Sequence, residues 1–210
     1  MKNTKRKIFG KNGYVLDLDT VSNKNDAFFK AIDAITNECV EALEILTEKY
    51  PEILEMVIAD DRETLLHCAA WNVKAFCFLA PRMPEALEKR NRDGQVPAHL
   101  AIYGVRSCGS IDALKMIEQM APETFEMTDI YGRTPAHIAS EELLSIAKNS
   151  EDFDKDSMYV RWAFDYLCCT HEKTMDKRNI KGETPLYHFK KACGVAVEKD
   201  EEKRDRERQS

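Results

Sequence analysis

Short apolar segments recur along the chain, and each is separated from the next by a polar turn. Four of them share one pattern: Thr-Leu-Leu-His-Cys-Ala-Ala at 64–70, Val-Pro-Ala-His-Leu-Ala at 96–101, Thr-Pro-Ala-His-Ile-Ala at 134–139 and Thr-Pro-Leu-Tyr-His-Phe at 184–189. A turn sequence with Asn or Asp first and Gly fourth begins five residues before three of them, at 91–94, 129–132 and 179–182. Because both features stay in register, the chain contains internal repeats.

Each apolar segment carries the residues that begin a helix. A threonine hydroxyl caps free backbone N–H groups, and proline suits the first helical position. The capping threonines are Thr64, Thr134 and Thr184, and the prolines are Pro97, Pro135 and Pro185. Val96 has no hydroxyl, which removes about 1 kcal/mol of capping energy from the second helix.

The turns supply the complementary signal, because glycine adopts positive φ without a steric penalty. The turn glycines are Gly94, Gly132 and Gly182. Arg62 stands where the first unit would have its glycine, so we expect an irregular first hairpin. Each unit is predicted to run turn, helix, loop, second helix and turn. Such a unit cannot bury its apolar face alone and must stack on its neighbours.

This pattern resembles the ankyrin repeat, whose usual signature is Asp-x-x-Gly-x-Thr-Pro-Leu-His-x-Ala. The match is strong at 91–101 and 129–139, good at 64–70 and partial at 179–189. The resemblance implies an all-α fold, an ankyrin-repeat solenoid of helix-turn-helix units with short β-hairpin-like turns. In that family the histidine ties the helix start to the adjoining turn, a structural role that carries over to His67, His99 and His137.

The repeats divide the chain into three parts. The ankyrin-repeat domain is expected at 24–193, with a cap at 24–58 and repeats starting near 59, 91, 129 and 179. Successive helix starts lie 32, 38 and 50 residues apart, against a usual period of ~33. We therefore expect insertions near 104–110 and 141–156, with a helix beginning near Ser157. Residues 1–23 form an N-terminal extension, either disordered or a small hairpin, and 194–210 form a charged tail.

Composition narrows the classes of function. Basic residues number 31 against 37 acidic ones, which argues against nucleic acid as a partner. No apolar stretch approaches ~18 residues, so membrane insertion is not expected. The seven cysteines follow no regular framework, which favours reduced thiols and a cytoplasmic location.

One cluster supports an alternative in which the chain is an enzyme or a zinc protein. Cys168, Cys169 and His171 lie close together in the sequence. Adjacent cysteines on a helix point about 100° apart, and zinc ligands usually come in spaced pairs. No nucleotide-binding glycine motif is present. We therefore predict no catalytic residue, no metal site and no cofactor, with the cluster kept as the alternative.

The exposed side chains of the repeats remain as the candidate site. By resemblance, a partner protein would bind the concave face formed by the turn tips and the first helix of each unit. The residues carried over to that face are Trp71, Arg90, Arg92, Tyr103, Ile130, Tyr131, Arg133, Arg178 and Ile180. Tyr, Trp and Arg are the residue types enriched at binding hot spots. The competing expectation is that the insertions fold over the aromatic side chains and bury them.

The predicted function is therefore a non-catalytic protein–protein interaction module or scaffold, acting as a monomer. A further alternative rests on the irregular repeats and on the Glu-rich terminus at 198–207. These features resemble the ankyrin effectors that intracellular bacteria secrete, which would place the chain in the cytosol of a host cell.

Overall fold

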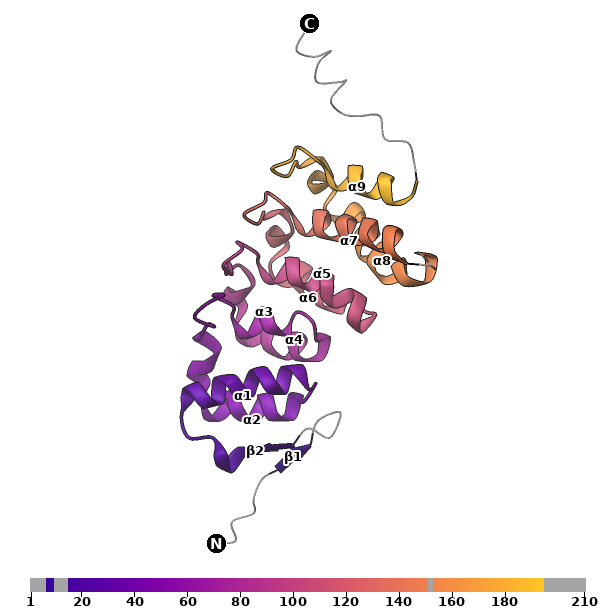
Figure 1. The fold of residues 1–210 in the computed structure, drawn as a ribbon. Helices are drawn as coiled ribbons and strands as arrows, with labels where there is room; N and C mark the ends of the chain where they lie inside the picture. The colour runs from indigo at the N-terminus through magenta and orange to yellow at the C-terminus, as the bar shows by residue number, and fades with distance from the viewer. Residues whose placement is uncertain (1–6, 10–14, 151–152, 195–210) are drawn as a thin grey trace, which may run out of the picture.

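The computed structural model describes residues 7–9, 15–150 and 153–194, and it is mainly helical (Figure 1). The α-helices in these ranges number nine: α1 (Lys24–Thr36), α2 (Val40–Lys49), α3 (Leu65–Ala69), α4 (Val73–Leu79), α5 (Pro97–Cys108), α6 (Asp112–Met120), α7 (Pro135–Asn149), α8 (Phe153–Thr170) and α9 (Pro185–Ala192). One short 3-10 helix precedes α1, at Leu18–Thr20, and others lie between the α-helices, at Pro51–Glu55, Ala80–Arg82, Pro84–Leu87, Pro122–Glu126 and Glu172–Asp176. The all-α class predicted from the sequence is confirmed.

The helices form pairs that stack in chain order, with the turns gathered along one edge (Figure 1). Helices α3, α5, α7 and α9 follow one another along the stack, and α7 packs against both α8 and α9. The core is continuous and includes fully buried Phe28, Phe76, Phe125 and Phe164. Burial of this shared core is what each short pair cannot achieve alone.

Small residues set the spacing between neighbouring pairs. Ala69, Ala101 and Ala139 are buried in α3, α5 and α7, which follow one another along the stack. Gly104 allows the closest approach, because a Cβ there would lie 2.0 Å from the carbonyl oxygen of Ala70. That distance is far inside van der Waals contact with backbone, so this position in α5 admits only glycine without a shift of the chain.

The surplus residues of the second and third units lengthen helices. The first helix has 5 residues in the first unit, but 12 in α5 and 15 in α7. Gly109 ends α5 with a φ of +65°, the left-handed conformation common at helix C-termini. The helix expected near Ser157 begins earlier, at Phe153. Residues 141–149 were predicted to lie in an insertion before a helix, and they instead extend α7.

Two strands precede the helices. β1 (Lys7–Phe9) pairs antiparallel with β2 (Val15–Asp17), with Ile8 opposite Leu16. This pairing corresponds to the small hairpin, one of the two alternatives for the N-terminal extension. The tail expected at 194–210 lies outside the described residues apart from Gly194. No helix in the described ranges is long and apolar enough to span a membrane.

Candidate functional site

The turns along one edge of the stack are built on a single polar residue each. The Oδ1 atom of Asn91 accepts backbone N–H bonds from Asp93 and Gln95, at 3.0 and 2.9 Å. Asp129 and Asn179 accept the equivalent pairs at 2.8–3.0 Å. The glycines Gly94, Gly132 and Gly182 then take φ values of +71° to +77°. The repeated Asn/Asp-x-x-Gly sequence therefore folds into a repeated turn.

The turns also bond to one another. The backbone N–H of Arg92 donates to Asp61 O at 2.7 Å, and that of Ile130 donates to Asp93 O at 3.0 Å. The N–H of Ile180 donates to Tyr131 O, also at 3.0 Å. These bonds fix the spacing of the turn tips, so the exposed side chains of Ile130 and Ile180 occupy successive positions along one edge.

The first turn is irregular, as expected from its missing glycine. Ile58 N–H bonds to Glu63 O, whereas Asn91 N–H bonds to Gln95 O, so the first turn closes around one more residue. Arg62 adopts a φ of +57°, a left-handed conformation that few residues other than glycine take.

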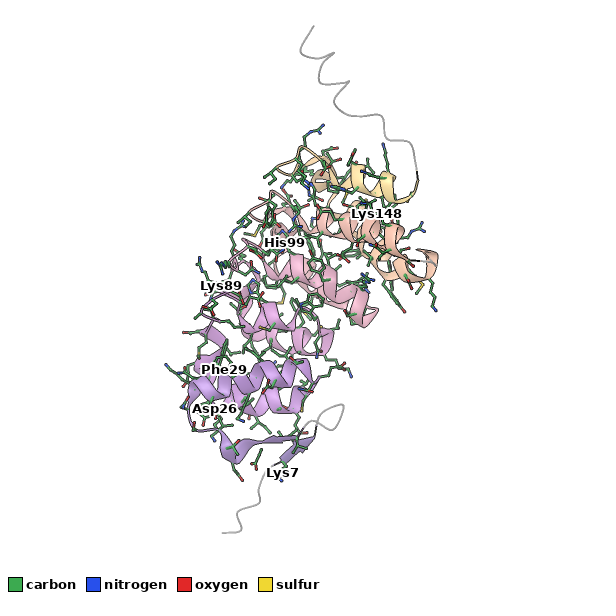
Figure 2. All side chains as sticks on the ribbon, in the orientation of Figure 1. Lys7, Asp26, Phe29, Lys89, His99 and Lys148 are labelled. Atoms are coloured by element: carbon green, nitrogen blue, oxygen red, sulfur yellow. The ribbon has the colours of Figure 1, made fainter. Side chains whose placement is uncertain are left out.

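Three buried histidines join each helix start to the next turn along the chain. The Nδ1 atom of His67 accepts the N–H of Thr64 at 3.2 Å, and its Nε2 lies 3.1 Å from Gln95 O. His99 makes the same bonds to Val96 N–H and Arg133 O, at 3.3 and 2.9 Å. His137 bonds to Thr134 N–H and Glu183 O, both at 3.1 Å. Figure 2 shows His99 within the stack.

These bonds settle the protonation state of the rings. A backbone N–H can only donate and a carbonyl can only accept, so Nδ1 carries no proton and Nε2 carries one. Burial lowers the pKa of His67, His99 and His137 to about 4 in each case, although backbone bonding to Nε2–H opposes the shift. At neutral pH all three are uncharged structural groups.

An aromatic pair lies on the face formed by the first helices. The rings of Trp71 and Tyr103 stack with centroids 5.7 Å apart and planes 10° from parallel. Trp71 is 49% exposed, and Tyr103 is half-buried beside it. The expectation that the insertions bury these side chains is wrong for Trp71, because the extra residues continue the helices. Tyr131 likewise remains 45% exposed.

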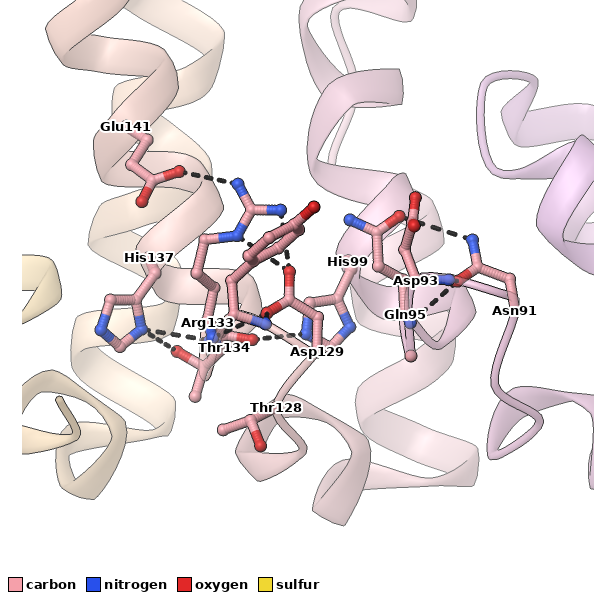
Figure 3. Close-up of polar contacts among 12 residues, drawn as sticks. Asn91, Asp93, Gln95, His99, Thr128, Asp129, Arg133, Thr134, His137 and Glu141 are labelled. Carbon is pink, nitrogen blue, oxygen red and sulfur yellow. Dashed lines mark hydrogen bonds and ion pairs between the residues drawn. The ribbon is translucent and has the colours of Figure 1, made fainter. Parts of the chain in front are cut away.

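Charged groups continue this face from Tyr103 to Tyr131. The Arg133 guanidinium bonds to the Asp129 carboxylate at 2.8 Å and to Glu141 Oε2 at 3.0 Å (Figure 3). It also lies 5.0 Å from the centre of the Tyr131 ring, within range of a cation–π contact. Burial lowers the pKa of Arg133, but Asp129 and Glu141 outweigh it and leave that pKa raised. Arg133 is therefore a fixed cation.

Two other predicted arginines also support the turns. Arg90 Nη1 donates to Gly94 O at 2.7 Å and to Thr128 O at 2.5 Å, and Arg178 Nη1 donates to Gly182 O at 2.7 Å. Both side chains remain exposed. Arg92, in contrast, is exposed at a turn tip, where its backbone N–H makes the bond to Asp61. The guanidinium groups of Arg90 and Arg178 thus bond to backbone carbonyls of the turns, whereas Arg92 contributes its backbone N–H.

A groove of about 770 Å³ lies between α7 and α9 at the end of this face. We call it the α7–α9 groove; its lining includes Tyr131, Glu141, Lys148, Ile180, Lys181, Glu183, His188 and Lys191. Sequence reasoning missed Glu141, Lys148, His188 and Lys191. The sequence did contain one signal for this lining: Glu141, Ser145 and Lys148 are spaced four and three residues apart. Residues at that spacing lie on one face of a helix, and α7 includes all three.

The cysteine cluster does not come together as a site. His171 Nε2 pairs with the carboxylate of Glu118, and its ring packs 4.7 Å from that of Phe125. Cys168 Sγ lies 3.5 Å from the sulfur of Met175, and Cys169 is exposed. Burial raises the pKa of Cys168, which disfavours a reactive thiolate. Over the described ranges, no three His, Cys, Asp or Glu residues are placed to hold a metal ion.

No family model matches the chain, and no curated protein matches it significantly.

Proposed function

We propose that this chain is a non-catalytic ankyrin-repeat protein that binds a partner protein through the face formed by its first helices and turn tips. The observation that carries the proposal is the stacked pair of Trp71 and Tyr103, with Trp71 about half exposed on that face. An exposed, preorganised aromatic pair offers a large contact area at low entropic cost. The partner would therefore meet a surface that is already ordered.

The repeated polar bonds support the ankyrin part of the proposal. The histidine that stands at the His position of the ankyrin signature bonds to the following turn in all three units that contain it. The fourth unit has Tyr187 there, and its helix starts with Thr184 Oγ1 accepting the Tyr187 N–H at 3.2 Å. This is the departure expected of a final unit, which has no described turn after it to bond.

The proposal is tested by affinity capture from a lysate of the cells that express the chain, followed by mass spectrometry. We expect Trp71→Ala combined with Tyr103→Ala to lose its partner, because hot-spot side chains each contribute ~2 kcal/mol or more. Circular dichroism should be unchanged, since Trp71 is exposed and Tyr103 is only partly buried.

The matched control is Trp162→Ala, because Trp162 is 51% exposed on α8. It removes an equally exposed tryptophan from outside the proposed face, so it should retain the partner. Capture that survives the double substitution, or is lost equally with Trp162→Ala, would contradict the assignment of the face.

A further inference from the structure

The α7–α9 groove has an uneven distribution of charge. Its rim carries three exposed lysines, Lys148 on α7, Lys181 in the last turn and Lys191 on α9. Among the residues that the structure describes, none of the three forms an ion pair. Figure 2 shows Lys148 at the surface of the stack. The rim is therefore a set of uncompensated positive charges.

One acidic group of the groove is already engaged, because Glu141 bonds to Arg133 at 3.0 Å. Glu183 is the other carboxylate; it lies 3.3 Å from His188 Nε2 without a hydrogen bond, and the three lysines of the rim outnumber it. A ligand that approached Glu141 would compete with its bond to Arg133. A ligand that approached Lys148 or Lys181 would meet no such competition, and Lys191 makes only a cation–π contact, with its Nζ 5.7 Å from the centre of the Tyr187 ring. The groove therefore favours negative charge in its occupant.

The floor of the groove contains a polar group that the chain leaves unsatisfied. His188 is 7% exposed, and neither of its ring nitrogens makes a hydrogen bond. Burial lowers the pKa of His188; Glu183 and Glu141 oppose this shift, while Lys191 and Lys181 add to it. Burial thus disfavours a positive charge on this ring, whereas the lysines of the rim are exposed.

Apolar surface is exposed beside the lysines. Ile180 is 70% exposed and Tyr131 is 45% exposed, and both line the groove. Side chains of this kind at the edge of a groove contact an apolar group of a ligand and exclude water around it. The occupant should therefore combine carboxylates with at least one apolar side chain.

We propose that the α7–α9 groove binds an acidic peptide segment of the partner, whose carboxylates pair with Lys148, Lys181 and Lys191 while an apolar side chain covers Ile180 and Tyr131. This inference rests on the proposed function and specifies which part of the binding face selects the partner. Its chemistry differs from that of the Trp71–Tyr103 pair, so the two sites can be tested separately.

The test selects short random peptides displayed on phage against the full chain. The expected enriched peptides have a net negative charge and at least one large apolar residue. Their affinity, measured by fluorescence anisotropy, should fall by about tenfold or more in Lys148→Glu combined with Lys191→Glu. It should also weaken as the salt rises from about 50 to about 300 mM, because ion pairs at an open rim are screened.

The matched control is Lys24→Glu combined with Lys49→Glu, which makes the same change in net charge at exposed lysines of α1 and α2. Enriched peptides that are neutral or basic, a selection that yields no peptide, or equal losses in the two charge-reversed variants would overturn the proposal. If Trp71→Ala with Tyr103→Ala abolishes capture of the partner but charge reversal at the groove does not, the proposed function stands and this inference fails.

Discussion

At the scale of single residues, three neutral imidazoles connect the units. Each buried ring accepts from a backbone N–H at the start of its own helix and donates to a carbonyl of the following turn. A protonated ring would place a second N–H against the backbone N–H that now donates to it. The uncharged form is therefore part of the packing between units.

His99→Ala should lower the free energy of unfolding by about 3 kcal/mol. The substitution leaves Val96 N–H and Arg133 O unpaired in a buried site and removes ring volume from the core. Urea denaturation followed by circular dichroism measures the change. Lys115→Ala, at an exposed position of α6, should leave the midpoint within error; a loss below about 1 kcal/mol for His99→Ala would argue against a structural role for the ring.

The same residues set the dependence of stability on pH. Burial holds the pKa of His67, His99 and His137 at about 4, below the model-peptide value of 6.5. Between these values the unfolded chain binds more protons, so the stabilising contribution is complete above about pH 6.5 and is lost as the pH falls toward 4. Each histidine contributes a slope of up to about 1.4 kcal/mol per pH unit.

We therefore expect the urea midpoint to fall steeply below about pH 6. In His99→Ala the slope of stability against pH should be shallower than in the native chain, because one of the three titrating groups is absent. An unchanged slope would mean that the acid sensitivity comes from other groups.

At the scale of elements, the sequence predicted the helix starts better than the helix lengths. Four helices begin where the sequence predicted, at or just after Thr64, Pro97, Pro135 and Pro185. These starts are predictable because capping is a local interaction within one turn. The end of α5 has a local signal in Gly109, but the end of α7 has none and depends on packing against neighbouring helices. The helical continuation of 141–149 was accordingly not predicted.

The candidate site also has one part that the sequence predicted and one part that it did not. The exposure of Trp71, Ile130, Tyr131 and Ile180 follows from their places in the repeat, and the structure agrees. The α7–α9 groove combines two helices and two turns, so its lining appears only in three dimensions. His188 illustrates the difference: its sequence gives no sign that it is buried between Glu141 and Glu183.

Gly104→Ala tests the close packing of α5 against the end of α3. Alanine normally stabilises a helix relative to glycine by about 1 kcal/mol. Here its Cβ would lie 2.0 Å from Ala70 O and 3.1 Å from the Cα of Trp71. We expect a net loss of about 1–2 kcal/mol in thermal or urea unfolding, and weaker partner binding as Trp71 moves. Ser107→Ala, exposed on the same helix, is the control; stabilisation by Gly104→Ala would show that the helices tolerate a wider spacing.

At the scale of the whole molecule, one side of the stack carries the features that suit binding. Ordered turns, the Trp71–Tyr103 pair, the fixed cation of Arg133 and the α7–α9 groove follow one another along it. The buried histidines and the shared core hold these features at fixed spacing, so the proposed binding face is ordered in advance of binding. The chain as a whole would then act as a rigid recognition surface.

Site-specific photo-crosslinking in cells tests the central claim most directly. Benzoylphenylalanine is placed at position 103 in one variant and at position 162 in another, and crosslinked products are identified by mass spectrometry. The account predicts one defined protein partner linked through position 103 and not through 162. A partner that crosslinks only through 162, or no crosslink at 103 when the partner is captured, would contradict it.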